Sequence, residues 1–506
     1  MKVALVSCQE NADILGVKCL HAHLLRSGHE STVLLVPSRG ERSVRAAVDF
    51  LARLAPGVVG FSAMTYELAA VRELAAACRR RLPRSLFVMG GIHATADPGS
   101  CLDVVDVVAR GEGEETLVGL LAALAEAGTR EAFAPETFAA VPGLAFRRGE
   151  ETVLAPPRPP VRDLDALPAP RHLPARMFVV HDGEARSFAE PALFRRYARY
   201  RGTFLSVLAS RGCPFSCSYC ANSTYRALYG ATPMRSRSAA GVVREIEEEV
   251  AAHPGLLYVN FADDCFLMNS PAWLAAFAAA YGARVGLPFI VRTTPRHVTA
   301  EKLATLRRAG LRWVFMGLQS GSDRVNREIY ERRVTAREFL DAAHAVAGAG
   351  LAAWYDVILD NPYESEAESR ETIDLLLRTP RPFQLDLFSL DFFPGTRLRE
   401  RALREGLPLP APGAKSYTRP EPRVINRLVR MSATLPPRVV RALVPLRGPA
   451  GRIAVAAAYA VALALEPFLY LRMIRLSMDG SVPRTLRVAR AFAATAVAKL
   501  YLRRLG

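Results

Sequence analysis

Short apolar runs alternate with helical patterns from residue 1 to about residue 127, and this alternation constrains the fold more than any other feature. Five runs have the length and composition of buried strands. They lie at residues 2–7, 31–36, 58–62, 86–90 and 104–109. Helical periodicity lies between them, near residues 14–27, 43–54, 67–82 and 114–127. Alternating strands and helices predict an α/β fold, here a five-stranded, parallel, doubly wound sheet.

A second alternation follows from about residue 201. Its strand candidates lie at residues 203–208, 256–261, 288–292, 313–317, 353–359 and 385–390, with helical patterns between them. Six such units predict an open partial (β/α)6 barrel. In a barrel of this kind, functional groups lie at the carboxyl ends of the strands.

We therefore expect four segments. Residues 1–130 form the first domain, and residues 131–200 form a linker, because the proline-rich run 155–160 disfavours helix. Residues 201–400 form the partial barrel. Residues 401–506 form a mostly helical C-terminal region that is basic and apolar.

Cysteine usage indicates a reducing environment. Of the eight cysteines, only Cys213, Cys217 and Cys220 are clustered, and nothing resembles a disulfide framework. The apolar run at residues 2–7 is too short for a signal peptide, so we expect a cytoplasmic protein.

The clustered cysteines have the spacing C-x₃-C-x₂-C. Three thiolates in one loop can hold a [4Fe–4S] cubane and leave its fourth iron without a protein ligand, whereas an electron-transfer cluster normally takes four cysteines. Zinc is the alternative, but it prefers four ligands, usually from two C-x₂-C pairs, and no second pair is present.

At this point the chain resembles the radical S-adenosylmethionine (SAM) superfamily, since the cysteine spacing and Tyr219 before the third cysteine both match. The resemblance implies that the open iron binds SAM and that the reduced cluster cleaves it to a 5′-deoxyadenosyl radical. It also implies an external electron donor of the flavodoxin or ferredoxin type. Candidate SAM-binding residues at the strand ends are Tyr219, Asp263, Asp264, Arg292, Gln319 and Ser320. Turn formation and helix capping are the alternative roles for the polar residues among them.

The fifth barrel strand ends in Asp360 and Asn361, where relatives have a sequence nearer G-x-P-x-E. This pair could face the substrate or cap the next helix. Tyr355, in the same strand, could serve as a radical or acid group, with packing as the alternative. These three residues are the candidates for catalysis.

The first domain carries glycine-rich strand ends in the order G-G-x-H-A-T and G-E-G-E-x-T, after a Ser-x-Met segment. In this order they resemble the flavodoxin-like cobalamin-binding domain that precedes the SAM domain in one radical SAM class. Candidate cobalamin-binding residues are Asn11, Ser62, Met64, Gly90, Gly91, His93, Gly111, Glu112 and Gly113.

The first loop departs from that family. Where many cobalamin domains have D-x-H-x-x-G, with the histidine on cobalt, this chain has Asn11 and Asp13, so Asp13 stands at the histidine position. Cobalt should then lack a protein imidazole below it. Alternatively, the domain is a vestige that no longer binds cobalamin.

These features together predict a cobalamin-dependent radical SAM enzyme that methylates an unactivated carbon of a small-molecule or lipid-like substrate. Cyclisation or rearrangement without methyl transfer is an alternative, because relatives use the same apparatus for both. A radical SAM enzyme with a vestigial first domain and a non-catalytic cobalamin or Fe–S sensor are further alternatives.

The C-terminal region carries most of the net charge of +17, because residues 421–506 contribute +12 (15 basic and 3 acidic residues). Residues 453–465 are uncharged, but Glu466 and Pro467 follow, so we expect this run to fall short of a membrane span. Arginines at roughly helical spacing, among them Arg438, Arg472 and Arg484, predict either peripheral membrane contact or a helical cap on the barrel. Few aromatic residues accompany them, which argues against nucleic acid.

Overall fold

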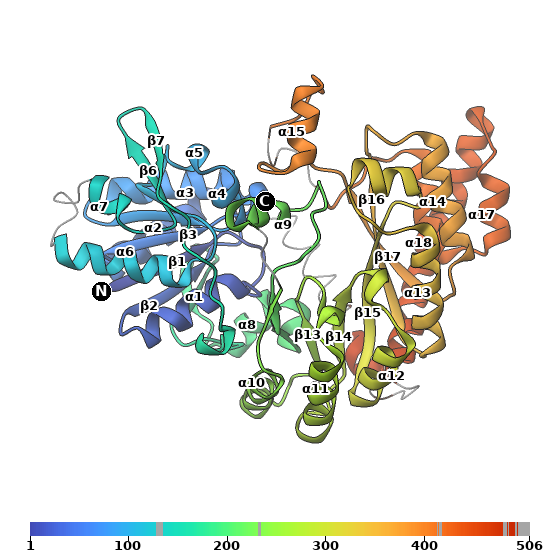
Figure 1. Cartoon of the computed structure of the whole chain (residues 1–506), viewed down its shortest axis with the longest axis horizontal. Coiled ribbons are helices and arrows are strands. Elements are labelled where there is room, and N and C mark those ends of the chain that lie inside the picture. The colour runs from blue at the N-terminus through green and yellow to red at the C-terminus, as the bar shows by residue number, and fades with distance from the viewer. Residues whose placement is uncertain are drawn as a thin grey trace.

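Two parallel sheets carry most of the chain in its computed structural model (Figure 1). The structure describes residues 1–127, 135–230, 234–411, 413, 417–478, 483, 485–490 and 493. The first sheet has nine strands and the second has six. Helices of the C-terminal region pack against the second sheet.

The five strands predicted near the N-terminus form the parallel centre of the first sheet, in the order β2-β1-β3-β4-β5. They are β1 (Lys2–Ser7), β2 (Glu30–Leu35), β3 (Val58–Ser62), β4 (Leu86–Gly90) and β5 (Val107–Ala109). On one face the sheet packs against α1 (Leu15–Arg26) and α6 (Glu114–Ala127), and on the other against α2 (Glu41–Leu54) and α3 (Leu68–Arg81). The doubly wound prediction is confirmed, and two short helices, α4 (Ile92–Ala96) and α5 (Pro98–Cys101), follow β4.

The segment predicted as a linker does more than connect the domains. It adds four strands to the first sheet, namely β6 (Leu144–Arg148), β7 (Glu151–Leu154), β8 (Met177–His181) and β9 (Glu184–Ser187). β6 pairs with β5 and β8 pairs with β2, so both edges of the parallel centre are covered. Among the described residues of this segment, the proline-rich run 155–160 between the hairpins has no helix or strand. Two helices, α7 (Pro135–Ala139) and α8 (Pro191–Tyr197), flank the hairpins.

The second sheet is the predicted open barrel of six parallel strands, all in chain order. They are β10 (Phe204–Val207), β13 (Tyr258–Phe261), β14 (Phe289–Thr293), β15 (Leu311–Gln319), β16 (Ala352–Leu359) and β17 (Phe383–Ser389). Its outer face packs against α10 (Ala239–Ala252), α11 (Pro271–Arg284), α12 (Ala300–Ala309), α13 (Ala336–Gly348) and α14 (Glu366–Arg378). A two-stranded ribbon, β11 (Ser210–Arg211) with β12 (Arg235–Ser236), and α9 (Asn222–Tyr229) lie between the first two strands in sequence.

Four helices make up the described C-terminal region, α15 (Arg397–Arg404), α16 (Val424–Thr434), α17 (Pro437–Leu443) and α18 (Gly448–Ser477). The expectation that Glu466 and Pro467 break the apolar run is wrong, because α18 continues through both. Glu466 turns to the protein and pairs with Arg430 at 2.9 Å. Pro467 is exposed, so water can satisfy the carbonyl that it leaves without a donor. Among the described residues, α18 is the one helix that is long and apolar enough to cross a membrane. Arg484, one of the arginines predicted to contact a membrane or to cap the barrel, lies outside the described residues.

The last turns of α18 cover the inner face of the barrel sheet. Met473 and Ile474 pack against Phe204, Tyr258 and Trp354, which alternate along their strands with residues that face the outer helices. The Tyr258 hydroxyl lies 2.8 Å from the Ser477 hydroxyl. The end of α18 is therefore part of the barrel's interior.

Candidate functional site

The three clustered cysteines lie in the loop between β11 and α9. All three are half-buried and free of disulfides. The loop is fastened at Ser218, whose backbone N–H donates to the Tyr330 carbonyl at 2.9 Å and whose carbonyl accepts from Leu398 N–H at 2.9 Å. Tyr219 packs edge-on against Tyr330, with ring centroids 4.9 Å apart. These contacts fix the loop's position relative to β15 and α15.

The cysteines fit a cubane better than a single ion. No group of three His, Cys, Asp or Glu side chains among the described residues converges closely enough to hold one metal ion. In a cubane each cysteine binds a different iron, so convergence on one point is not needed. Burial raises the pKa of Cys213 and Cys220 to about 12, so cluster assembly would release protons from these thiols.

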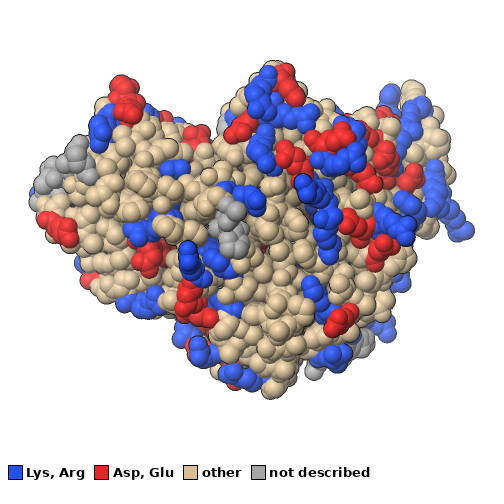
Figure 2. All heavy atoms as spheres, viewed as in Figure 1, with Lys and Arg blue, Asp and Glu red and all other residues tan. Residues whose placement is uncertain are grey.

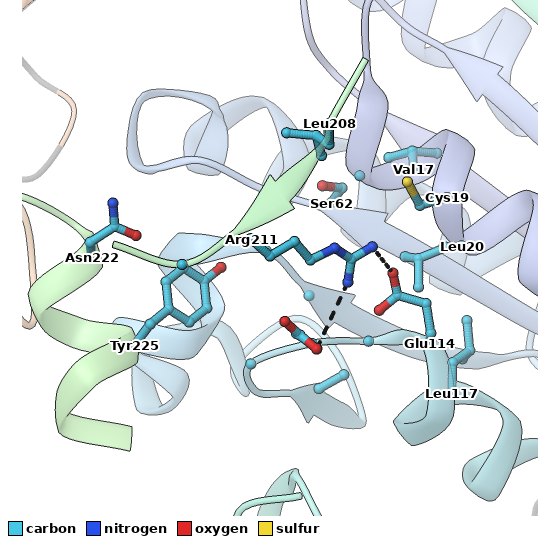
Figure 3. Close-up of a pocket in the computed structure, with 18 of the residues that line it drawn as sticks. Val17, Cys19, Leu20, Ser62, Glu114, Leu117, Leu208, Arg211, Asn222 and Tyr225 are labelled. Atoms are coloured by element: carbon cyan, nitrogen blue, oxygen red, sulfur yellow. Dashed lines mark hydrogen bonds and ion pairs between the residues drawn. The ribbon is translucent and has the colours of Figure 1, made fainter. Parts of the chain in front are cut away.

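One cavity of about 360 Å³ reaches from the first domain to this loop (Figure 3). On the first domain it lies over the ends of β3, β4 and β5 and between α1 and α6. An apolar slot there is lined by Leu5, Val17, Leu20, Val88 and Leu117, with Gly16 and Gly60 leaving it open. On the barrel side the lining includes Cys213, Asn222, Tyr225 and Asp264. The slot offers an apolar, flat-sided recess, which suits a large planar cofactor.

The cobalamin candidates divide into two groups in the structure. Six of the nine line the cavity, namely Ser62, Gly90, Gly91, Gly111, Glu112 and Gly113. The other three do not line it and bond within their own domain. Asn11 accepts from Asp13 N–H at 3.0 Å, the Met64 sulfur accepts from the Tyr66 hydroxyl at 3.1 Å, and buried His93 lies 3.1 Å from the Thr65 hydroxyl.

The G-E-G-E segment joins the two domains. Glu114 binds Arg211 at 2.6 Å (Figure 3). Glu112 binds Arg235 at 2.6 Å and lies 3.8 Å from Arg211. The Glu112 backbone N–H donates to the Tyr229 hydroxyl oxygen at 2.6 Å. Arg211 directly precedes the cluster loop. Sequence reasoning missed this network, although an arginine beside Gly212 and Cys213 was a visible signal.

Removing the Glu114 charge should destabilise the protein. The Glu114 side chain is 6% exposed and Arg211 20%, and leaving one partner of a buried pair alone costs on the order of 3 kcal/mol. We expect Glu114→Gln to lower the urea midpoint of unfolding at neutral pH. Glu115→Gln is the matched control, because that carboxylate is 48% exposed and should change the stability by less than about 0.5 kcal/mol.

The same pair gives a pH dependence. Burial alone would raise the pKa of Glu114, but Arg211 outweighs it and holds the pKa below its usual value. A carboxyl with a lowered folded-state pKa stabilises the protein above its unfolded pKa, about 4.3, and loses this effect as the pH falls through the folded value. The difference between wild type and Glu114→Gln should therefore shrink below about pH 4. An undiminished difference at that pH would contradict the ion-pair explanation.

The two aspartates after β13 have different surroundings. Asp263 is fully buried and accepts from the Ser210 hydroxyl and from Ala209 N–H, the latter at 3.2 Å. Burial raises its pKa to about 6. Asp264 lines the cavity close to Cys213, and burial raises its pKa too. Asp263 therefore positions the ribbon that carries the cluster loop, and of the two SAM candidates only Asp264 lines the cavity.

The remaining SAM candidates lie at the ends of β14 and β15. Arg292 donates to the Asn260 side-chain oxygen at 3.0 Å and lies 5.2 Å from the Phe315 ring centroid. Gln319 has a positive φ of 70° and folds over Gly317, where a Cβ would lie 2.4 Å from its amide nitrogen. Ser320 is buried and donates to Glu364 at 2.9 Å. Ser320 thus has a structural partner within the protein.

The three catalytic candidates have structural roles in the described contacts. Asp360 accepts from the Ser389 hydroxyl at 2.7 Å and from Asn426 at 2.7 Å, and so fastens the C-terminal region. Asn361 donates to the Tyr330 hydroxyl at 3.2 Å. Tyr355 is 1% exposed and packs with Phe339 on the helix side of the sheet. These contacts match the packing role that the sequence left open for Tyr355.

The residue that follows Tyr355 in β16 faces the inner side of the sheet. Asp356 on β16 and Asp386 on β17 are paired in register on the inner face of the sheet. Burial raises the pKa of Asp356 to about 7, and Asp386 adds to this effect while Arg292 opposes it. Neither carboxyl group was predicted from the sequence. The prediction for this strand considered Tyr355, whereas Asp356, the next residue, faces the opposite side of the sheet.

Asp13 also belongs to this interior network. It accepts from the Ser206 hydroxyl at 2.7 Å, Ser206 accepts from the Asn260 amide at 3.1 Å, and Asn260 accepts from Arg292. The residue at the histidine position of the cobalamin motif is therefore held by the barrel. His21 and His23 of α1 are buried elsewhere, with His21 2.9 Å from the Ser31 hydroxyl and His23 3.2 Å from Glu115.

Known proteins match both halves of the chain. The Radical SAM superfamily matches residues 207–376, and the B12 binding domain matches residues 1–121. An uncharacterized methyltransferase of Pyrococcus horikoshii is 26% identical over 70% of this chain and 70% of its own length. The anaerobic magnesium-protoporphyrin IX monomethyl ester cyclase of Cereibacter sphaeroides is 30% identical over 67% of this chain and 51% of its own length.

A solved structure shares the fold over nearly the whole chain. It is the radical S-adenosylmethionine methyltransferase TsrM from Kitasatospora setae with cobalamin and [4Fe–4S] cluster bound, at a TM-score of 0.66, 18% identity and 99% coverage of both chains. The chain is a radical SAM enzyme. Its first domain makes it one of the B12-binding members of that superfamily, with a [4Fe–4S] cluster, SAM and cobalamin as cofactors.

Proposed function

We propose that this enzyme transfers a methyl group from SAM, by way of cobalamin, to an unactivated carbon of a small-molecule or lipid-like substrate. The observation that carries the proposal is the single cavity shared by the strand ends of the first domain and the cluster loop. Two cofactors seated in one cavity can act on the same carbon. Relatives named as methyltransferases support this choice of reaction.

The bound cofactors would together supply a substrate radical and the methyl group that joins it. The chain's own residues seat and align them. Cys213, Cys217 and Cys220 would hold the cluster, and Asp264 beside Cys213 would meet the polar end of SAM. The apolar slot would hold part of the cobalamin and exclude water. The ion pairs at Arg211 and Arg235 would keep the two sites at a fixed separation.

Ring formation or rearrangement without methyl transfer is the second candidate. It is favoured by the likeness to the magnesium-protoporphyrin IX monomethyl ester cyclase, whose name denotes a cyclisation. A vestigial first domain and a non-catalytic sensor are less well supported, because the slot between α1 and α6 is open and continuous with the cluster loop.

Two partners complete the proposal. A flavodoxin or ferredoxin type protein would reduce the cluster, since the chain has no other clustered cysteines to relay electrons. The C-terminal region would contact a membrane, because its sequence is both basic and apolar.

Isotope transfer separates methylation from cyclisation. The reconstituted enzyme would be incubated anaerobically with SAM labelled in its methyl group, a reductant and extracts that contain candidate substrates. We expect a product that carries the labelled methyl group, formed together with 5′-deoxyadenosine. A product that forms with 5′-deoxyadenosine but without label would overturn methylation in favour of cyclisation or rearrangement.

A further inference from the structure

The side of α18 that faces away from the protein is apolar and exposed. Its largest side chains are Ile453, 69% exposed, Phe468, 68%, and Val461, 54%, with Leu463, Leu465 and Leu471 at 40–43%. Small exposed residues fill the spaces between them, namely Ala456, Ala457, Ala460, Ala464 and Pro467. We call these residues the α18 outer face. From Ile453 to Leu471 it is about 27 Å long at 1.5 Å per residue.

No charge interrupts the α18 outer face. Between Arg452 and Arg472 the one charged residue is Glu466, which turns to the opposite side and binds Arg430 and Gln384. That opposite side is packed, with Val455 and Ala462 buried against the barrel's helices. The helix is thus apolar on both sides, and the protein's own described residues cover only one. Exposed apolar surface of this extent marks a binding surface.

Arginines border the α18 outer face. Arg452 lies at one end, Arg472 and Arg475 lie at the other, and Arg438 and Arg441 lie on the adjoining α17; all five are exposed. Within the described residues no carboxylate forms an ion pair with any of these five. In Figure 2 the outermost right edge, where α17 lies in Figure 1, is made of blue and tan atoms. A surface that is apolar at its centre and cationic at its border complements anionic lipid.

A second copy of the chain fits this surface less well. Two copies meeting face to face about a two-fold axis would bring the same arginine border of each against the other. Like charges across such an interface oppose association. A bilayer with anionic headgroups instead offers acyl chains to the apolar centre and phosphates to the arginines.

We propose that α18 docks the enzyme on an anionic bilayer, with its outer face in the boundary between headgroups and acyl chains and its axis in the membrane plane. The packed side of α18 excludes an orientation in which the helix spans the membrane. On that side Glu466 pairs with Arg430, and Met473 and Ile474 pack against the barrel sheet. This deepens the membrane contact proposed above and is independent of the reaction.

Vesicle binding tests the docking surface. The full chain would be floated with vesicles of phosphatidylcholine alone and of phosphatidylcholine with phosphatidylglycerol. We expect binding to the anionic vesicles, and at least about tenfold weaker binding for Ile453→Asp with Phe468→Asp, since a carboxylate is not accommodated among the acyl chains that these apolar side chains would contact. Leu403→Asp is the matched control, because Leu403 is 55% exposed on α15, away from this face; it should bind as wild type does.

Arg438→Ser with Arg441→Ser tests the border. We expect it to weaken binding to anionic vesicles, with no effect on phosphatidylcholine. Equal binding to both vesicle types, or no binding to either, would overturn the proposal. Concentration-dependent dimers that Phe468→Asp dissolves would assign the face to a second copy instead. SAM cleavage without vesicles is expected to be unchanged in all these variants, so a failed docking result would leave the proposed reaction standing.

Discussion

Replacing Cys217 with alanine is expected to abolish the iron–sulfur cluster and the cleavage of SAM together. The cluster loop supplies three thiolates, and the loop itself holds no fourth cysteine to take the lost position. With two ligands a cubane is not held, so the open iron that would bind SAM is lost as well. Iron and sulfide content and the yield of 5′-deoxyadenosine after anaerobic reconstitution measure both effects. Both should fall to the level of a sample without protein.

Cys78→Ala is the matched control for this loss. Cys78 is buried in α3, in the core between that helix and the first sheet, and it does not line the cavity. The control variant should retain the iron, the sulfide and the SAM cleavage of wild type. A Cys217→Ala protein that still binds a full cluster and cleaves SAM would show that the loop has been misassigned.

Filling the apolar slot is expected to weaken cobalamin binding about 30-fold and to leave SAM cleavage in place. Gly60 lies on β3 and lines the slot, and a Cβ there would be 3.1 Å from a methyl carbon of Leu5. The added methyl groups of Gly60→Val would project into the recess rather than displace the backbone. Overlap of this size costs about 2 kcal/mol, which corresponds to about 30-fold weaker binding of hydroxocobalamin. Titration followed by corrin absorbance measures the change.

Gly348→Val serves as the control for this substitution. Gly348 is exposed at the end of α13, and a Cβ there meets nothing within 4 Å. Its corrinoid affinity should equal that of wild type. If Gly60→Val also binds hydroxocobalamin as tightly as wild type does, the corrinoid does not use the slot between α1 and α6.

Strand and helix positions were largely predictable, because apolar runs and their spacing depend on local sequence. All eleven strands expected for the two sheets are present, although the first sheet gains four more. Those four strands come from residues 131–200, which were predicted to form a linker because of the prolines in residues 155–160. Pairing with the edges β2 and β5 decides their structure, and such pairing partners are distant in sequence.

Candidate site residues can be predicted where a sequence motif defines them. They are harder to predict where the orientation of the side chain decides whether a residue reaches the cavity. The cysteine spacing identifies Cys213, Cys217 and Cys220 directly. Asp263 and Asp264 are adjacent in sequence, yet one is buried under the ribbon and the other lines the cavity. Similarly, Tyr355 faces the helices while Asp356 faces the interior. One residue of shift reverses the side of a strand, and only the packed sheet fixes which side is inner.

The prediction about Pro467 was wrong for a related reason. Proline disfavours a helix interior through its missing N–H and its ring, and this cost is local. The packing of α18 against the barrel and the pairing of Glu466 with Arg430 act over a longer range and outweigh it.

The central claim is that one cavity serves both cofactors, and anaerobic reconstitution of the full chain tests it most directly. The protein would be supplied with iron, sulfide, hydroxocobalamin, SAM and dithionite, desalted, and assayed for retained corrinoid and for 5′-deoxyadenosine. The account predicts one tightly held corrinoid per chain in a protein that also cleaves SAM. Formation of 5′-deoxyadenosine by a protein that retains no corrinoid would contradict it.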